Sequence, residues 1–131
     1  MLDYKSENAQ TIMHTGHSVQ INFESGSTIK GAHLMKHYTL AQFHLHWGSE
    51  MGHGSEHTLD GKATEAEIHF VHWNSSKYET IEEALKHDDG LAVLGALIKQ
   101  DDKRSNKNQA HQIIKHFPEE WNIGEKYPLK G

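Results

Sequence analysis

The chain has 131 residues, a formal net charge of −5 at pH 7 and no cysteine. This length suits one domain with a substantial core, and the absence of long basic or acidic runs argues against nucleic-acid or membrane-surface binding. Neither a membrane-spanning segment of roughly 18 apolar residues nor a signal peptide is visible, and the compartment is left open. Without cysteine there is no disulfide and no thiolate metal site.

Three segments are predicted to be strands. Residues 18–26 ("SVQINFESG") alternate apolar and polar side chains and then turn, which is typical of a half-buried strand. Residues 39–47 ("TLAQFHLHW") and 66–73 ("AEIHFVHW") are the next candidates. The loop between them is rich in Gly, Ser and Asp, and its Asp60-Gly61 pair favours a tight reversal. The last two strands are therefore expected to be antiparallel neighbours.

The second half of the chain predicts mixed elements. Residues 80–87 favour a short helix in which Thr80 is the N-cap and Glu83 completes a capping box. The apolar run at 90–99 ("GLAVLGALIK") suits a strand buried on both faces, although its periodicity also allows a buried helix. Residues 108–117 have helical spacing of apolar side chains, and the proline that follows ends the pattern.

Histidine is the unusual residue in this composition, since thirteen are present. Strand periodicity places His44 and His46 on one face of their strand, and His69 lies on a defined face of the next. If the two strands pair with these faces matched, the three imidazoles converge. Three histidines with a fourth position open are typical of a catalytic zinc ion rather than a structural one.

The residues two positions before the candidate ligands strengthen this hypothesis. Gln42 precedes His44 and Glu67 precedes His69, each on the same face as its histidine. A metal-bound histidine needs an acceptor for its other ring nitrogen, and an amide oxygen or a carboxylate is suitable. The sequence therefore supplies partners that would orient two of the three ligands.

The alternative is that such histidines are ordinary polar residues. A lone His-x-His on a strand is more often a surface or cross-strand pair, and only the second strand with its acidic residue favours a metal site. Trp47 and Trp73 are expected in the core. A surface or structural role is expected for the remaining histidines outside the motifs: His14, His33, His37, His53, His72, His87, His111 and His116.

Four motifs in order resemble the alpha-class carbonic anhydrases: "QFHLHWG", "GSEHTLDGK", "AEIHFVHWN" and "DGLAVLG". The resemblance implies a mainly β (α+β) fold, with a large, twisted, mostly antiparallel sheet and short surface helices. It also implies a Zn²⁺ ion bound by His44, His46 and His69, and reversible hydration of carbon dioxide to bicarbonate by a zinc-bound hydroxide. In this family the zinc-bound water has a pKa of about 7, a known property of carbonic anhydrases and not one read from this sequence.

The resemblance also implies roles for five further residues. His17, in "TGHSVQI", corresponds to the family's proton shuttle, which passes the proton to buffer. Glu56 corresponds to a glutamate that orients a threonine hydroxyl, and His57 to a buried structural histidine. Val71 and Val93 correspond to residues lining the apolar pocket for carbon dioxide.

Residues 1–131 are expected to form a partial domain, because the family domain is about twice as long and only its middle is matched. The threonine that Glu56 would orient has no counterpart, so a zinc-binding but inactive fragment or a related binding module is the alternative function. A cupin-type oxygenase also uses His-x-His followed by an acid, which His44, His46 and Glu50 satisfy, but its later Pro-Gly-His segment is absent. The oligomeric state is not predicted.

Overall fold

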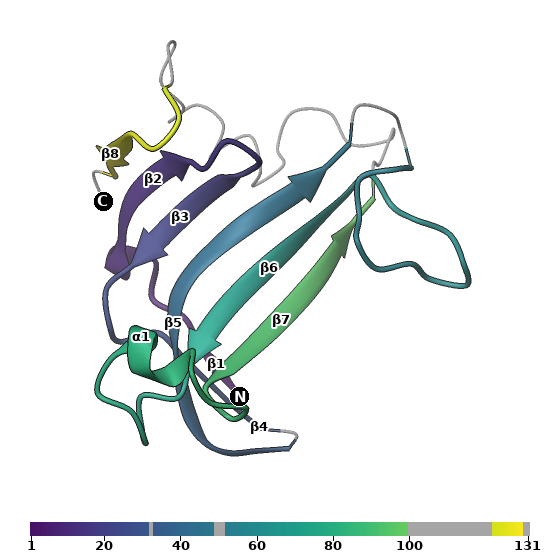
Figure 1. The fold of residues 1–131 in the computed structure, drawn as a ribbon. Coiled ribbons are helices and arrows are strands. Elements are labelled where there is room, and N and C mark those ends of the chain that lie inside the picture. The colour runs from purple at the N-terminus through teal and green to yellow at the C-terminus, as the bar shows by residue number, and fades with distance from the viewer. Residues whose placement is uncertain (32, 49–51, 100–121, 130–131) are drawn as a thin grey trace.

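The computed structural model describes residues 1–31, 33–48, 52–99 and 122–129, and its main feature is one antiparallel sheet (Figure 1). The eight strands of the sheet are β1 (Leu2–Asp3), β2 (Ala9–His14), β3 (Val19–Phe23), β4 (Thr28–Gly31), β5 (Leu34–Trp47), β6 (Ala66–Trp73), β7 (Leu91–Ile98) and β8 (Lys126–Pro128). Helical structure in the described residues is limited to the 3₁₀ turn η1 (Ser6–Asn8) and the helix α1 (Ile81–Ala84). The predicted fold class is confirmed.

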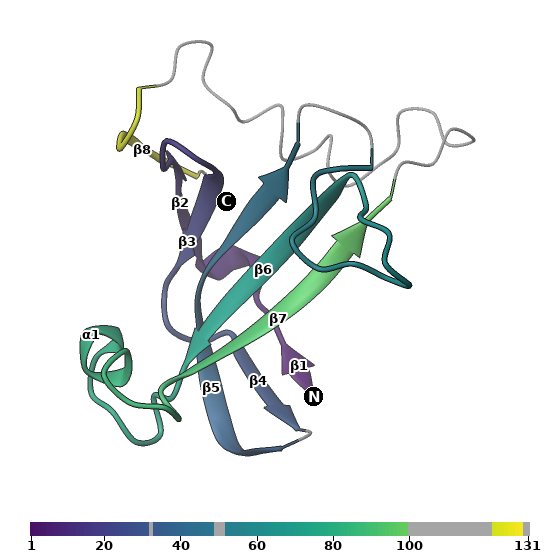
Figure 2. The same ribbon diagram turned by 45° about the vertical axis from the view of Figure 1, so that its right-hand side comes forward.

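The long strand β5 organises the sheet. On one side it pairs with β4 near its start and with β3 near its end, and on the other side it pairs with β6. Figure 1 shows β5, β6 and β7 running side by side, with β2 and β8 continuing the sheet beyond β3. In the turned view of Figure 2, β2 and β3 are steeply inclined to β6 and β7, so the sheet is strongly twisted.

A bulge in β5 determines which residues share a face. Leu40 pairs with His72 and Gln42 pairs with Val71, so Ala41 is an extra residue on β5. Beyond the bulge, the residues of β5 and β6 again pair one to one. Gln42 therefore lies on the same face as Val71, while Leu40 lies on the opposite face with His72.

The opposite face carries the core. Ile12 and Leu40 are each 1% exposed, and Ile12 packs with Ile21 on the neighbouring strand. The Phe43 ring lies 5.4 Å from the Phe70 ring across the β5–β6 pair, in a tilted arrangement. This apolar packing fixes β3, β5 and β6 against one another and leaves their other face available for polar side chains.

His72 is a buried structural histidine, as predicted. Its Nδ1 donates to the Ala92 carbonyl oxygen at 3.1 Å, so its Nε2 accepts from the Tyr4 hydroxyl at 2.6 Å. Burial lowers the pKa of His72 and raises the pKa of Tyr4 to about 12. Both groups therefore stay neutral, and together they satisfy polar atoms inside the core.

Two local predictions agree with the structure. The Asp60-Gly61 pair makes the expected reversal: both residues have positive φ angles, 52° and 75°, and Leu59 and Lys62 exchange backbone hydrogen bonds on either side. Thr80 caps α1, since its hydroxyl accepts from the Glu83 N–H at 3.2 Å.

The second hydrogen bond of the predicted capping box, from the Thr80 N–H to the Glu83 carboxylate, is not among those found. The Glu83 carboxylate instead accepts from Lys86 Nζ at 3.1 Å and lies 3.3 Å from His87 Nε2. These partners lie three and four residues after Glu83, in the turn that follows α1, where the backbone still brings such side chains together.

Two burial predictions are wrong. The strand at 91–98 is present, but it is not buried on both faces: Val93 is 54% and Leu97 40% exposed. The reason is that, within the described residues, β7 pairs only with β6 and forms an edge of the sheet. Trp47 is 52% exposed, because the pairing with β3 ends at His44 and leaves the end of β5 uncovered on that side.

Two other expectations concern helices. The helix predicted at 108–117 lies outside the described residues. In the part of the chain that the structure describes, no helix has the length and apolar character needed to cross a membrane.

The burial of Leu40 gives a stability prediction. Replacing Leu40 with alanine removes apolar contacts and leaves a cavity, so the free energy of unfolding should fall by about 2 to 5 kcal/mol in urea denaturation. Leu59→Ala is the matched control, because Leu59 is 67% exposed and should change stability by less than about 0.5 kcal/mol. Equal losses for the two variants would contradict the described core.

Candidate metal centre

Three histidines converge on the face of the sheet opposite the core. His44 of β5 and His69 of β6 are direct cross-strand partners, and His46 lies opposite Glu67 two pairs further along. Cross-strand partners share a face, so the register places all three imidazoles together. The predicted meeting of these side chains is confirmed.

The spacing of the rings suits a single small cation. The ring centroids of His44 and His46 are 4.9 Å apart, those of His44 and His69 5.4 Å, and those of His46 and His69 4.6 Å. One nitrogen from each ring lies within 4.8 Å of the others. Tetrahedral zinc at its usual bond lengths needs a nitrogen separation of about 3.4 Å, so only a small closure of the rings is required.

Gln42 fixes the orientation of His44. The Gln42 amide oxygen lies 2.9 Å from His44 Nδ1, which therefore carries the proton and donates it. The Nε2 lone pair of His44 remains for a metal. Burial, and then the nearby His46 and His69 rings, lower the pKa of His44, so this ligand is held in its neutral form.

Glu67 fixes His69 in the same way and is the most constrained carboxylate of the site. Its side chain is 2% exposed. One oxygen accepts from the backbone N–H groups of Glu56 and His57, both at 2.8 Å. The other accepts from His57 Nδ1 at 2.6 Å and from His69 Nε2 at 2.9 Å. Because His69 Nε2 donates, its Nδ1 is the nitrogen with a lone pair for a metal.

The hydrogen bonds to Glu67 keep its carboxyl group ionised. Burial alone would raise its pKa, but hydrogen bonds from His57, His69 and the Glu56 backbone outweigh it and lower the pKa to about 2. Glu67 is therefore a carboxylate at neutral pH and accepts hydrogen bonds only.

The third histidine supplies the test of whether these residues fit a metal. His46 Nε2 is buried and has no hydrogen-bond partner among the described residues. A buried polar atom without a partner is rare and needs an explanation. With the free nitrogens of His44 and His69 beside it, a bound cation would satisfy it. The donor set of three imidazole nitrogens fits zinc.

Glu56, in the loop between β5 and β6, also lies at the site. Its carboxylate oxygens lie 3.4 Å from His46 Nδ1 and 3.8 Å from His69 Nδ1, and its side chain is 54% exposed. The structure thus brings Glu56 beside two of the three histidines.

The expectation that His57 is buried is wrong. Its side chain is 77% exposed, although its Nδ1 donates to Glu67. His57 lies in the loop between β5 and β6 and not in a strand, which accounts for this exposure.

Of the remaining predicted residues, Val71 and Val93 lie on the same face, and His17 lies in a turn. Val71 and Val93 are direct cross-strand partners on β6 and β7. Val71 is half-buried and Val93 is exposed, so the second is not the core valine that its sequence alone suggested. His17 is exposed in the turn between β2 and β3, where its backbone N–H bonds the Thr15 hydroxyl at 3.4 Å.

Gly95 is a residue that the sequence analysis did not single out. It lies opposite His69 on β7, and a β-carbon there would come within 3.3 Å of the Glu67 carboxylate and 3.7 Å of the His69 ring. Glycine therefore leaves room for the Glu67–His69 hydrogen bond. The available signal was an isolated glycine inside an apolar strand, which indicates a close approach by another group.

Comparison with known proteins identifies the group to which this chain is similar. The family model for eukaryotic-type carbonic anhydrase matches residues 1–130. Carbonic anhydrase 1 of Mus musculus is 46% identical over 101 residues, which cover 75% of this chain and 39% of the relative.

Two further relatives give the same result. Carbonic anhydrase 1 of Oryctolagus cuniculus is 45% identical over 100 residues, covering 75% of this chain and 43% of the relative. Carbonic anhydrase 7 of Homo sapiens is 41% identical over 111 residues, covering 82% of this chain and 42% of the relative. The chain thus spans about two fifths of the length of the curated relatives it matches.

The hydrogen bonds of Glu67 predict its effect on metal affinity. In Glu67→Gln, one of the two acceptor oxygens is replaced by an NH2 group that faces donors, so the bonds that orient His69 and those that hold the loop cannot all form. Zinc affinity should fall about 10- to 100-fold in a chelator competition assay. Glu79→Gln, which alters an exposed acid after β6, should leave the affinity unchanged. Near-UV circular dichroism verifies folding, and equal affinity of a folded Glu67→Gln variant would contradict this role.

Proposed function

Because the chain belongs to the eukaryotic-type carbonic anhydrase family, we propose that it catalyses the reversible hydration of carbon dioxide with zinc bound by His44, His46 and His69. The activity is a proposal because the match covers about two fifths of each relative. The observation that carries it is the convergence of three imidazole nitrogens within 4.8 Å, one of them buried and without a partner among the described residues.

In this proposal zinc, when bound, supplies a Lewis acid that makes water a nucleophile at neutral pH. The chain's own residues hold two of the ligands in fixed orientations. Gln42 holds His44 with Nε2 available, and Glu67 holds His69 with Nδ1 available. Because both partners belong to the same strands as the histidines, the ligand geometry is set before the metal arrives.

Carbon dioxide is proposed to bind beside the metal centre on the exposed side of β6 and β7. Val71 and Val93 lie on the same face as His69, two pairs further along the strands. Val93 is 54% exposed, so it presents apolar surface to a small apolar substrate. Glu56, with one carboxylate oxygen 3.4 Å from His46 Nδ1, is proposed to orient polar groups at the site.

His17 is proposed to carry the proton away from the site. The turn that holds it is docked against β5, since the Ser18 hydroxyl donates to the Leu45 carbonyl oxygen between the two histidines of that strand. An exposed imidazole in this position can exchange protons with buffer.

The alternatives weighed from the sequence receive less support. A zinc-binding but inactive chain is not favoured by the comparisons, which match catalytic relatives by name. The cupin-type interpretation required Glu50 as a ligand, and Glu50 lies outside the described residues. The family match over residues 1–130 argues against that interpretation.

The decisive experiment is stopped-flow hydration of carbon dioxide by the zinc-loaded chain. We expect hydration that depends on one equivalent of zinc and is lost in His44→Ala, because that variant removes a ligand. His33→Ala, which alters an exposed histidine elsewhere, should retain the activity. One bound equivalent of zinc with no hydration above the His44→Ala level would support the inactive alternative.

A second prediction concerns proton transfer. In His17→Ala, kcat in dilute buffer should fall at least about 10-fold, because the proton loses its relay, while kcat/KM should change little. Added imidazole buffer should restore kcat. His53→Ala, another exposed loop histidine, serves as the control. A fall in kcat that imidazole does not restore would argue against the relay.

A further inference from the structure

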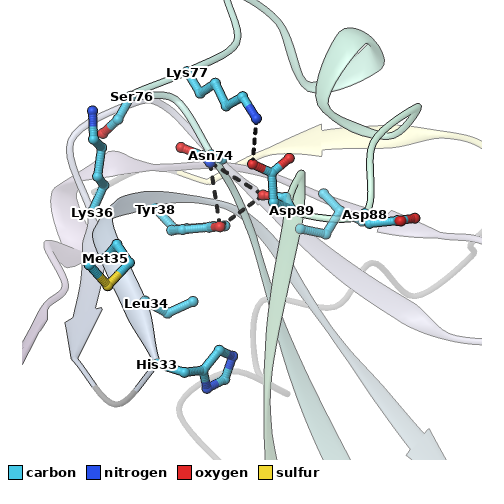
Figure 3. A pocket seen from close by; sticks show the side chains of 11 residues that line it. His33, Leu34, Met35, Lys36, Tyr38, Asn74, Ser76, Lys77, Asp88 and Asp89 are labelled. Carbon is cyan, nitrogen blue, oxygen red and sulfur yellow. Dashed lines mark hydrogen bonds and ion pairs between the residues drawn. The ribbon is translucent and has the colours of Figure 1, made fainter.

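A pocket of about 390 Å³, with both polar and apolar lining residues, lies at the other end of β5 and β6 from the histidines (Figure 3). Asn74, the first residue after β6, lines it, together with residues from the start of β5 and from the turn before β7. Asn74 is five residues from His69 along an extended strand, a separation of about 16 Å. The pocket is therefore separate from the candidate metal centre.

Asn74 is held rigidly in the wall of this pocket. It is 6% exposed, and its backbone N–H donates to the Gly90 carbonyl oxygen at 2.8 Å. Its side-chain nitrogen donates to the Asp89 carbonyl oxygen at 3.3 Å and to the Tyr38 hydroxyl at 3.4 Å. The Tyr38 hydroxyl itself donates to the same carbonyl oxygen at 2.8 Å. Because a carbonyl oxygen accepts only, the nitrogen of the amide must face it.

This orientation leaves the amide oxygen of Asn74 without a donor. The oxygen is buried, and none of the described residues donates to it. In Figure 3 it points to the side of the pocket that Ser76 and Lys36 line. A buried acceptor facing a pocket indicates that a ligand or an ordered water supplies the missing hydrogen bond.

The charges around the pocket select the kind of ligand. Lys77 is neutralised by the Asp89 carboxylate at 2.7 Å. The other acidic lining residue, Asp88, lies on the opposite side of the pocket from Lys36 (Figure 3). The Ser76 hydroxyl donates to the His37 carbonyl oxygen at 3.0 Å, so its lone pairs remain to accept. Lys36 contributes an exposed ammonium group on the same side. A matching ligand needs a donor for Asn74 and, next to it, a negative group for Lys36.

We propose that this pocket binds a free α-amino acid as its zwitterion. The ammonium group donates to the Asn74 amide oxygen and the Ser76 hydroxyl oxygen, and the carboxylate pairs with Lys36. An aliphatic side chain packs against Leu34 and Leu91, two of the apolar lining residues. Adjacent ammonium and carboxylate groups match the adjacent acceptor and cation, which neither a simple amine nor a simple carboxylate does.

The test is titration of the whole, metal-free chain with L-valine by calorimetry. Removing the metal prevents chelation by valine, so the result is independent of the proposed hydration activity. We expect saturable binding that weakens at least tenfold in Lys36→Met. Lys86→Met, which alters an exposed lysine after α1, should bind within twofold of the unaltered chain. Isobutylamine and isovalerate, which each lack one charged group of valine, should bind at least tenfold more weakly.

A second measurement locates the ligand. On adding valine, the side-chain amide resonance of Asn74 should shift in ¹H–¹⁵N spectra, while those of Gln42 at the metal centre should not. Absence of binding, unchanged binding by Lys36→Met, or shifts confined to the metal centre would overturn the proposal. A crystal structure at saturating valine with only water against the Asn74 amide oxygen would overturn it as well.

Discussion

The register between β5 and β6 is the constraint on which the candidate metal centre depends. It makes His44 and His69 direct partners and places His46 opposite Glu67. Because side chains alternate across a strand, a slip of one residue would turn the histidines of one strand into the core face. The register is held from the other face, where the Phe43 and Phe70 rings pack across the same two strands. Hydrophobic packing on one face thus determines the geometry of the polar site on the other.

Glu67 extends this constraint from the strands to the loop between them. A buried carboxylate is unfavourable unless it is well paired, and Glu67 accepts four hydrogen bonds. Two come from the backbone at Glu56 and His57, so the carboxylate ties the loop to β6 while it orients His69. The position of Glu56 beside His46 follows from the same bonds, since the backbone of Glu56 is one of the donors.

Period-two patterning predicted most of this arrangement from the sequence. It gave β6 with the observed bounds and the face shared by His44 and His46, because each of these signals lies within one strand. The antiparallel pairing that brings His69 to them was inferred from the tight reversal at Asp60-Gly61. Burial was harder to predict, since it depends on neighbours that a strand pattern does not identify. His57 and Val93 were both expected to be buried, but they are exposed. His57 lies in a loop, and Val93 lies on β7, an edge strand within the described residues. The bulge at Ala41 and the space left by Gly95 depend on pairing between strands and could not be predicted from one segment alone.

The bulge at Ala41 also explains how one strand can serve the core and the site together. Before it, Leu40 and His72 are cross-strand partners buried on the core face. After it, Gln42 and Val71 are partners on the metal face. Without the extra residue, continuous alternation would place Leu40 on the same face as Gln42, so one of the two would lie in the wrong environment. The single inserted residue therefore lets β5 anchor the core at its start and present its histidines to the other face at its end.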